Sequence, residues 1–525
     1  MGTREGKAAA SGGEGEGEGG AGEARPGAAR ASSLELDARA LGELAEAFVG
    51  LTNDYLARGH EGRVFPETSA AALRAAFDRA LPAEGEPLAG LVDDCRAVLG
   101  ASRDNGHPRM FGYVASPATP VGVYGSLLAA ALNQNVVAWR SAPAAAAVER
   151  VVVRWLAELV GYAGGGAGGL LTSGGSMANL MALLMALRAS APAGELSRRG
   201  LWGPGPPATL YVSDQVHFSV TKAAEVIGVG REQVRVVPSD EHFRLDARAL
   251  DEAIERDGRA GLRPFCVVAS AGTVATGAVD PLAAVAGVAR RRGLWLHVDG
   301  AYGALAAAVP AKRPLFAGLA EADSLSLDPH KWLYAPVGCG CLLVRDPAAA
   351  RAAFGGAGGG YVKILEGDAD EAFAFWDYGV ELSRPFRALG LWLMLRYYGA
   401  RRVVAAIEGD CALAGRLAEL VRAADDFELL APPALGICCF RYAPPASRAA
   451  LARGEAGENA RLDALNERLV HRVQRGGRAY LSNAELRGRV ALRASITNYR
   501  TTGADLERTL EAVREAARSL DEGPT

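Results

Sequence analysis

Short apolar runs alternate with Ala- and Leu-rich segments between residues 168 and 344, and this alternation constrains the fold more than any other feature of the chain. Apolar runs of this length are typical of buried strands, and several of the segments that follow them have helical patterns. Strands that alternate with helices predict a mostly parallel sheet covered by helices. We therefore expect an α/β fold with these strands: "GGLLTS" at 168–173, "TLYVS" at 209–213, "FCVVAS" at 265–270, "LWLHV" at 294–298, "SLSL" at 324–327 and "CGCLLV" at 339–344.

The chain as a whole divides into four regions. Residues 1–33 are a Gly-, Glu- and Ala-rich stretch of low complexity, which predicts a disordered tail. Residues 34–107 are expected to be helical, because apolar residues recur there at three- and four-residue steps and a second helix is indicated over 69–81. The α/β pattern is expected to form a large domain over 108–400. Residues 401–525 show the order helix, strand, strand, helix, strand, helix, which predicts a smaller α+β domain.

The bulk properties exclude several classes of protein. The 525 residues carry a net charge of −3, which favours neither nucleic acid nor an anionic membrane as a partner. The N-terminus lacks the apolar core of a signal peptide, and no stretch is apolar enough to predict a membrane span. The seven cysteines form no CxxC pair. No metal site is therefore predicted, and we expect reduced thiols in a cytoplasmic protein.

Polar residues follow the ends of five predicted strands. In an open α/β sheet, ligands bind outside the carboxyl ends of the strands. Each residue alone is weak evidence, because solvated polar side chains collect at any sheet edge, and the combination carries the prediction. We expect five side chains to meet at this edge: Ser176, His217, Thr273, Asp299 and Lys331.

The segment "TSGGSMANLMALLMALR" has the pattern of a strand, a glycine turn and a long helix. Gly174 and Gly175 leave backbone N–H groups open to an anion, and Ser176 adds a hydroxyl at the helix start. This combination is typical of a phosphate site at a helix N-terminus. The segment matches neither GxxxxGK[ST] nor GxGxxG, which disfavours a nucleotide. An ordinary capped helix is the alternative.

A phosphate site, a lysine and a carboxylate together indicate pyridoxal phosphate. The chain has five lysines, and a lysine at a strand end suggests chemistry that arginine cannot perform, because only lysine loses its proton in proteins. Lys331 is the candidate for the Schiff base with the cofactor. Asp299 is the candidate partner of the pyridinium nitrogen, and the small Ala301 leaves room for the ring. His217 and His330 are both candidates for stacking on the ring.

The sequence resembles the group II pyridoxal-phosphate-dependent amino-acid decarboxylases, which include aromatic-L-amino-acid decarboxylase and glutamate decarboxylase. The C-terminal "LRASITNYRTT" also fits this family, whose members have fold type I, the aspartate aminotransferase-like fold. The resemblance covers residues 107 to 399 and rests on motifs in the family's order: "HPRMFGYVASPATPVGVYGSLLAAALNQNVVAWRSAPA", "TSGGSMAN", "SDQVHFSV", "AGTVATGAVDP", "LHVDGAYG", "DSLSLDPHKWL" and "DYGVELSRPFRALGLWLMLRYYG".

The resemblance implies a role for each matching position. Lys331 corresponds to the Schiff-base lysine, Asp299 to the partner of the pyridine nitrogen and His217 to the histidine that stacks on the ring. Tyr361, in a glycine-rich stretch, corresponds to the loop tyrosine that assists the return of a proton to Cα. Asp328 stands where some relatives have Asn. The further cofactor-binding positions are Gly175, Ser176, Thr273, Ala301, Asp328 and His330, and the substrate-side positions are Ser116, Val137 and Trp139.

The implied reaction is decarboxylation of an L-amino acid to its amine and CO2. The tract 107–139 and "DPHKWL" favour an aromatic amino acid. Glutamate, aspartate, cysteine sulfinate and 2,4-diaminobutyrate stay open, because the sequence does not place Arg109, Arg140 or Arg384 in the pocket. If Tyr361 is not the loop tyrosine, an aldehyde synthase is an alternative, and an aminotransferase of the same fold is another.

The resemblance also implies a partner. Members of this family are homodimers with active sites at the subunit interface, and we expect the same here. The helices between residues 34 and 81 are expected to wrap around the second subunit.

Overall fold

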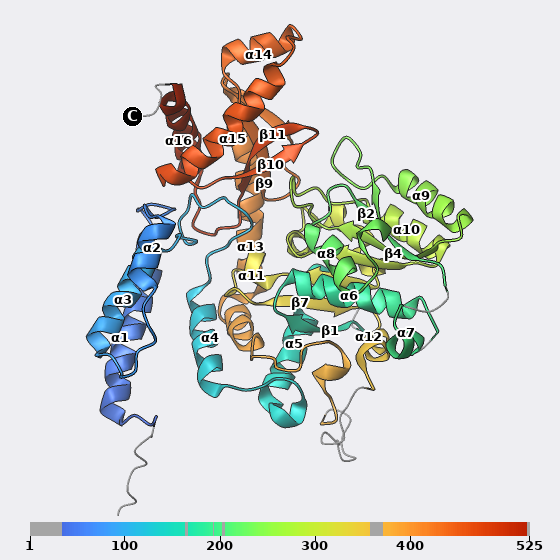
Figure 1. The fold of residues 1–525 in the computed structure, drawn as a ribbon, viewed down its shortest axis with the longest axis horizontal. Coiled ribbons are helices and arrows are strands. Elements are labelled where there is room, and N and C mark those ends of the chain that lie inside the picture. The colour runs from blue at the N-terminus through green and yellow to red at the C-terminus, as the bar shows by residue number, and fades with distance from the viewer. Residues whose placement is uncertain (1–33, 163–165, 193, 202–204, 357–370, 522–525) are drawn as a thin grey trace, which may run out of the picture. The chain divides into compact units, whose positions relative to one another are not determined.

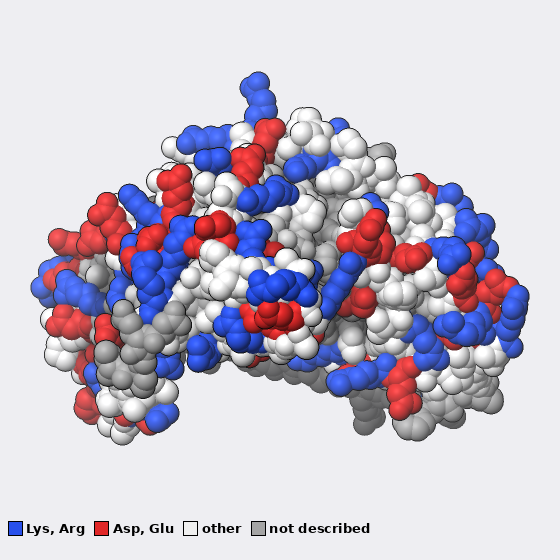
Figure 2. Space-filling view, turned by 90° about the horizontal axis from the view of Figure 1, so that it is seen from above, with Lys and Arg blue, Asp and Glu red and all other residues white. Residues whose placement is uncertain are grey.

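The computed structural model describes residues 34–162, 166–192, 194–201, 205–356 and 371–521. The predicted tail lies outside these residues. Within the described ranges, no helix combines the length and the apolar character that crossing a membrane requires. Figure 2 shows basic and acidic residues interspersed over the visible face, as expected for a chain whose net charge is −3.

A sheet built from seven of the described strands forms the larger layer of the fold (Figure 1). The strands are β1 (Gly168–Thr172), β2 (Ala208–Ser213), β3 (Val234–Val237), β4 (Arg263–Ser270), β5 (Trp295–Asp299), β6 (Ser324–Leu327) and β7 (Gly340–Val344). They lie in the order β1-β7-β6-β5-β4-β2-β3. Neighbours from β3 to β6 are parallel, and β7 is antiparallel to both β1 and β6. β1 therefore runs in the same direction as β6, and the carboxyl ends of every strand except β7 meet at one edge.

Helices alternate with these strands along the chain. They are α4 (Pro120–Leu132), α5 (Pro143–Val160), α6 (Gly175–Ala189), α7 (Glu195–Arg199), α8 (Phe218–Val226), α9 (Ala247–Arg259), α10 (Leu282–Arg292), α11 (Pro329–Trp332) and α12 (Pro347–Phe354). Most of them pack on the sheet, whereas α4 packs on the C-terminal helix α13 (Ala388–Ala423). α6 packs along the central strands, with α8 and α12 beside it. α9 and α10 pack against β4, and α5 packs against β1. The α/β fold with a mostly parallel sheet is thus confirmed.

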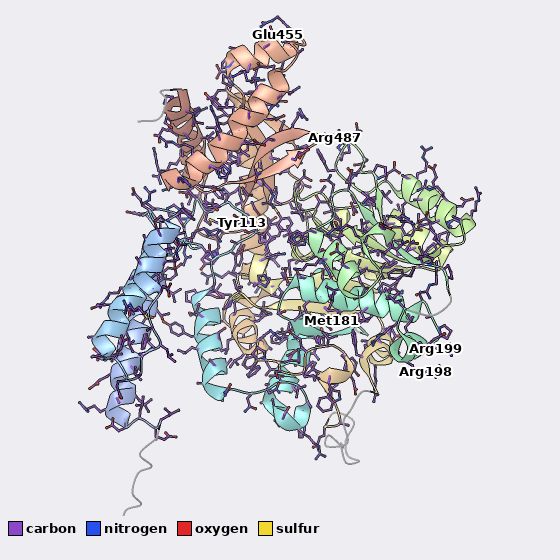
Figure 3. All side chains as sticks on the ribbon, in the orientation of Figure 1. Tyr113, Met181, Arg198, Arg199, Glu455 and Arg487 are labelled. Atoms are coloured by element: carbon purple, nitrogen blue, oxygen red, sulfur yellow. The ribbon has the colours of Figure 1, made fainter. Side chains whose placement is uncertain are left out.

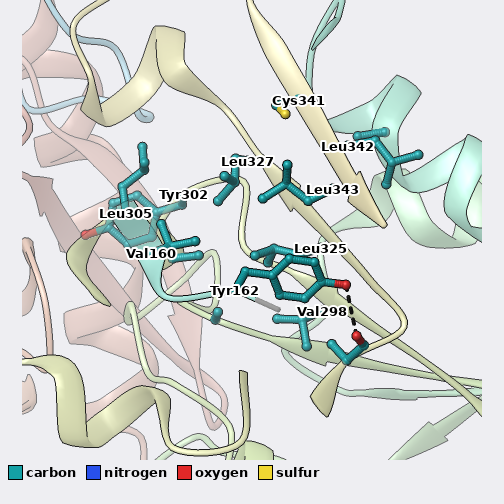
Figure 4. Close-up of a cluster of buried hydrophobic side chains, with 14 of the residues drawn as sticks. Val160, Tyr162, Val298, Tyr302, Leu305, Leu325, Leu327, Cys341, Leu342 and Leu343 are labelled. Atoms are coloured by element: carbon teal, nitrogen blue, oxygen red, sulfur yellow. Dashed lines mark hydrogen bonds between the residues drawn. The ribbon is translucent and has the colours of Figure 1, made fainter. Parts of the chain in front are cut away.

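Alternate residues of β5 point to opposite faces of the sheet, as the two-residue period of a strand requires. His297 and Asp299 face α6, whose Asn179 hydrogen-bonds to both. Val298 belongs to the apolar cluster that Figure 4 shows, together with Tyr162, whose hydroxyl donates to a backbone carbonyl at 2.9 Å. The face toward α6 is therefore polar near the strand ends, and the other face is apolar.

A second, antiparallel sheet lies in the C-terminal part, in the order β10-β11-β9-β8. Its strands are β8 (Phe427–Ala431), β9 (Ile437–Tyr442), β10 (Ser482–Leu486) and β11 (Arg489–Ser495), and the helices of this part are α13 (Ala388–Ala423), α14 (Pro445–Ala452), α15 (Glu458–Gly476) and α16 (Gly503–Asp521). α13 is interrupted at Gly399, whose φ of 73° suits a residue without a Cβ. The interruption lies beside the predicted domain boundary at residue 400, which itself stays a prediction.

The N-terminal helices are α1 (Ala38–Ala57), α2 (Ala70–Phe77) and α3 (Leu88–Ala101). Of the described residues, 34–57 and 86–93 form a compact unit, and the rest of the chain forms a second one. The predicted first helix is confirmed by α1. The second begins where expected, after the N-cap Ser69, but ends at Phe77 and not near residue 81. A proline at position 82 disfavours helical backbone in the residue before it.

The six predicted strands of the large sheet are confirmed, with ends that differ by at most two residues. The prediction missed β3, a four-residue edge strand that carries the charged Arg235 and so lacks a continuous apolar run. It also missed β10, whose sequence "SNAEL" is weakly apolar because alternate side chains are exposed, and the short helix α14. Pairing with β11 stabilises β10, and this neighbour is not visible in the local pattern.

Candidate active site

A cavity of about 830 Å³ lies at the sheet edge where the carboxyl ends of the strands meet. The residues after β1, β2, β5 and β6 contribute to its walls, which is the site that an open parallel sheet offers to a ligand. Eight of the sequence-predicted residues line it: Gly175, Ser176, His217, Asp299, Ala301, Asp328, His330 and Lys331. Of the five side chains predicted to meet at this edge, four line the cavity, and Thr273 does not.

Lys331 enters the cavity from α11, a single helical turn that follows β6. Pro329 occupies the first helical position, where its fixed φ suits the turn. The Lys331 ammonium lies 2.9 Å from Oδ2 of Asp328, which is buried. The other oxygen of Asp328, Oδ1, is buried without a hydrogen-bond partner. A buried carboxylate with spare acceptor capacity therefore holds the amine in the cavity.

Asp299, the last residue of β5, is a buried carboxylate surrounded by donors. Its Oδ2 accepts from Asn179 Nδ2 at 2.8 Å, and its Oδ1 accepts from Ser326 Oγ and from the Ala301 backbone N–H, each at 3.1 Å. Burial alone would raise the pKa of Asp299, but the neighbouring His297 imidazole, the Lys331 cation and the Asn179 amide together hold it below its usual value. The side chain is therefore ionised and ready to pair with a cationic ring nitrogen.

His217 caps the N-terminus of α8 and lines the cavity. Its Nδ1 lies 2.7 Å from Ser219 Oγ and accepts from the Ser219 N–H at 3.2 Å. Burial lowers its pKa. His330 lies nearer the lysine, and its Nδ1 donates to the Cys339 carbonyl at 2.8 Å. The two histidines thus hold fixed ring orientations in the cavity.

The first turn of α6 borders the cavity with Gly175 and Ser176. A Cβ at position 175 would lie 2.8 Å from the Ala301 side chain and 2.9 Å from Asp328 Oδ2, so glycine is required for this close approach. The unpaired N–H groups of a first helical turn, together with the Ser176 hydroxyl, suit a phosphate. The cradle lies on the same edge as Lys331 and Asp299.

Four predicted residues do not line this cavity. Thr273 is buried, and its hydroxyl accepts from the Ala278 N–H and contacts Thr276. Ser116 donates to the Lys331 carbonyl, so it touches the lysine only through the backbone. Val137 and Trp139 pair with the backbone of residues 373–375, and their role with substrate stays a prediction. Tyr361 lies outside the described residues.

The sequence missed Arg493, which comes from β11 and closes the cavity with Glu485 of β10. Arg493 is buried, and its Nη1 donates to the Tyr113 carbonyl at 2.8 Å while Nε donates to the Val274 carbonyl at 2.9 Å. Its Nη2 is buried without a partner. Tyr113, marked in Figure 3, lines the cavity itself. The motif "LRASITNYRTT" contained Arg493, but its position in a distant sheet gave no local sign of the cavity.

These groups fit the chemistry of pyridoxal phosphate. The cavity combines a helix-start cradle for a phosphate, an ionised carboxylate for a ring nitrogen, an amine for an aldehyde and an imidazole beside them. The family model "Pyridoxal-dependent decarboxylase conserved domain" matches residues 70–443. The chain belongs to the pyridoxal-dependent decarboxylase family. It is a carboxy-lyase with pyridoxal phosphate as cofactor.

Relatives of this decarboxylase differ in the amino acid that their names specify. The aromatic-L-amino-acid decarboxylase of Bacillus atrophaeus is 32% identical over 489 residues, which are 93% of this chain and 98% of the relative. The cysteine sulfinic acid decarboxylase of Homo sapiens is 34% identical over 376 residues, which are 72% of this chain and 75% of the relative. Among solved structures, Oryza sativa TDC with PLP and tryptamine superposes with a TM-score of 0.84 at 29% identity, over 92% of this chain and 99% of that one.

Proposed function

We propose that this decarboxylase converts an aromatic L-amino acid to its amine and CO2. The observation that carries the proposal is the charge of the substrate wall. Among the described residues, Arg493 is the one arginine that lines the cavity, and it has one unpaired nitrogen, Nη2. An acidic amino acid brings two carboxylates, and Glu485 on the same wall would repel the second. The remaining lining of this wall includes the apolar Val114 and Val274 and the aromatic Tyr113, which suit an aromatic side chain.

The other arginines considered as partners of an acidic substrate are engaged elsewhere. Arg384 is fully buried in an ion pair with Glu149, and Arg109 donates to Asp505 and to a backbone carbonyl. Arg140 is exposed and does not line the cavity. Arg384 is thus a core residue, and none of the three supplies a second carboxylate site in this cavity.

We propose roles for the residues of the cavity that follow from their positions. Lys331 binds the cofactor aldehyde, Asp299 pairs with the ring nitrogen, and the first turn of α6 binds the phosphate. The bound cofactor supplies an electron-accepting ring for the pair released when the Cα–carboxylate bond breaks. Arg493 orients a substrate carboxylate with its free Nη2. His217, which lines the same cavity, would stack on the ring of the bound cofactor and exclude water from it.

Product analysis with a panel of amino acids tests the substrate. The purified protein with pyridoxal phosphate would be given L-tryptophan, L-tyrosine, L-phenylalanine, glutamate, aspartate, cysteine sulfinate and 2,4-diaminobutyrate, with CO2, amine and aldehyde measured separately. We expect amine and equimolar CO2 from at least one aromatic amino acid. Turnover of only acidic or diamino substrates would refute the aromatic assignment. Formation of an aldehyde in place of an amine would show that the enzyme is an aldehyde synthase.

We also propose that the enzyme is a homodimer. Apolar side chains of α4 recur at helical spacing and remain exposed in the single chain: Tyr124, Leu127, Leu128 and Leu132. α1 has an apolar stripe as well, yet none of its residues is buried. Apolar helix faces of this kind are typical of subunit interfaces, and a second copy of the chain is the occupant that the family resemblance implies.

Light scattering after size-exclusion chromatography tests the dimer. The wild type should have twice the mass of the chain, and Leu128→Glu should shift it toward the monomer. The matched change Leu315→Glu, at an exposed leucine outside α4, should leave the mass unchanged. A monomeric wild type would refute the proposal.

A cytoplasmic location is proposed too, because seven free thiols suit a reducing compartment. Recovery of the enzyme in a membrane or secreted fraction would contradict this location.

A further inference from the structure

A chain of buried hydrogen bonds runs beneath the cavity and reaches both Asp299 and His217. The Trp295 indole N–H donates to Ser324 Oγ at 2.9 Å, and Ser324 Oγ lies 2.9 Å from His297 Nδ1. Nε2 of His297 lies 3.0 Å from Asn179 Oδ1. Ser324, His297 and Asn179 are essentially inaccessible to solvent. Asn179 borders the cavity from α6, whereas Ser324 and His297 lie behind the cavity wall.

The direction of every bond in this chain follows from the charge of Asp299. An ionised carboxylate accepts only, so Asn179 must present its NH2 group to Asp299 Oδ2 and its carbonyl to His297. His297 must then carry its proton on Nε2 and accept from the Ser324 hydroxyl at Nδ1. This neutral tautomer agrees with the burial of His297, which lowers its pKa to about 4.

A second branch leaves the same amide and ends at His217. The other N–H of Asn179 donates to Ser219 Oγ at 3.0 Å, so the hydroxyl proton of Ser219 is free to point to His217 Nδ1, 2.7 Å away. Nδ1 also accepts from the Ser219 backbone N–H. A neutral His217 that accepts twice at Nδ1 carries its proton on Nε2.

We propose that Asn179 is a positioning residue that couples the two functional groups of the cavity, with His297 as its anchor. One buried amide donates to the carboxylate that pairs with the ring nitrogen and, through Ser219, sets the proton of His217. Hydrogen bonds aligned in one direction strengthen one another. The inference concerns the cofactor end of the cavity and does not depend on which amino acid is the substrate.

Cofactor affinity measured with a matched analogue separates this role from a structural one. Pyridoxal phosphate and its analogue with C–H in place of the ring nitrogen would be titrated into the apo protein of each variant. In Asn179→Leu we expect affinity for pyridoxal phosphate to fall about tenfold or more, because a hydrogen bond to a charged group is lost. Affinity for the analogue, which has no ring nitrogen to pair with Asp299, should change little. An equal loss for both ligands would overturn the proposal.

Nitrogen NMR of His217 in the apo protein tests the other branch. The wild type should show Nε2 protonated, and Asn179→Leu should show a mixture of the two tautomers. Ser326→Ala is the matched control, because it removes a donor to Asp299 from outside the chain. It should weaken binding of pyridoxal phosphate and leave the His217 tautomer unchanged. A His217 tautomer that is the same in Asn179→Leu as in the wild type would refute the coupling.

Variants of His297 keep the test decisive if Asn179→Leu does not fold. His297→Phe removes the donor to Asn179 and should move both readouts in the same direction by a smaller factor. His297→Gln keeps an N–H that can reach Asn179 and should restore them toward the wild type. If His297→Phe and His297→Gln behave alike in both readouts, the anchor role of His297 is wrong.

Discussion

The two sheets build opposite sides of one cavity in different ways. The seven-stranded sheet supplies Asp299 and Lys331 from the ends of neighbouring parallel strands, and each lies in a short motif. The four-stranded sheet supplies Glu485 and Arg493 from an antiparallel hairpin far along the chain. The first side has the groups that suit the cofactor, and the second has those that we assign to the substrate. The candidate groups for the cofactor can therefore be found from local sequence motifs. The groups that we assign to the substrate depend on how the second sheet packs against the cavity.

Removing the lysine should have the largest effect on the cofactor side. Lys331→Ala loses the amine that we assign to the cofactor aldehyde, so we expect kcat/KM to fall by at least about a thousandfold. The visible absorbance of lysine-bound cofactor should vanish as well. Lys222→Ala, at an exposed lysine of α8, is the control and should behave as the wild type. Retained absorbance in Lys331→Ala would move the covalent site to another lysine.

A buried carboxyl group links α11, on the side of the seven-stranded sheet, to α13. It should make the stability of the protein depend on pH. Asp410 accepts from Trp332 Nε1 and from the Tyr334 hydroxyl, each at 2.8 Å, and burial raises its pKa from 3.8 to about 7. Because the folded state binds this proton more tightly than the unfolded chain does, the stabilisation is complete below pH 4 and is lost as the pH rises through 7. A shift of this size corresponds to about 4 kcal/mol at most.

Thermal unfolding at pH 5 and pH 8 measures this contribution. The wild type should lose stability over that interval, and Asp410→Asn should flatten the dependence because it has no proton to release. Asp425→Asn, at an exposed acid just after the end of α13, is the control. An Asp410→Asn variant whose pH dependence equals that of the wild type would show that Asp410 titrates normally.

A change on the substrate side should separate the two functions. Arg493→Gln removes the guanidinium that we assign to a substrate carboxylate, so kcat/KM should fall about ten- to a hundredfold, as expected for a charge-assisted hydrogen bond. Affinity for pyridoxal phosphate should stay within about twofold of the wild type. Arg489→Gln lies on the same strand and pairs with Glu428, so it controls for damage to the sheet. If Arg493→Gln loses affinity for the cofactor and Arg489→Gln does not, the assignment of the cofactor to one side of the cavity and the substrate to the other is wrong.

The smallest effect is expected at Glu485, an exposed charge on the rim of the same side. Glu485→Gln should change kcat/KM for the best aromatic amino acid by less than about threefold, because exposed charges interact weakly. Turnover of cysteine sulfinate relative to that substrate should rise a few fold as repulsion is removed. Glu467→Gln, on an exposed face of α15, should leave the ratio unchanged. A falling ratio in Glu485→Gln would contradict the assigned repulsion.

The cofactor side could be predicted in detail because its signals are local. A glycine turn, an Asp after an apolar strand and a Lys two residues after a Pro each need only a few residues to be visible, and the parallel order of the strands brings them together. Thr273 shows the limit of this reasoning. It follows a strand as predicted, but its hydroxyl satisfies the loop between β4 and α10 and does not reach the cavity.

Other groups could not be found in this way because their partners are distant in the sequence. Asn179 lies inside a quoted motif on α6, yet its role depends on His297 and Asp299, which come from β5. Arg493 has an ordinary pattern for a residue of β11, and only the tertiary structure shows that its Nη2 has no partner. The local patterns of β3 and β10 are weak because both are edge strands with charged or polar residues. Pairing with a neighbouring strand stabilises them, and the local sequence does not show that neighbour.

The sequence by itself determined the α/β core, the strand ends to within two residues and the candidate groups for the cofactor, since apolar periodicity and short polar motifs act over a few residues. Only the tertiary structure decided which of those groups face the cavity and which form hydrogen bonds within a loop instead. It also decided that a hairpin of the second sheet closes the cavity with one arginine and one glutamate. These outcomes depend on packing between segments far apart in the chain, and no local pattern contains that information.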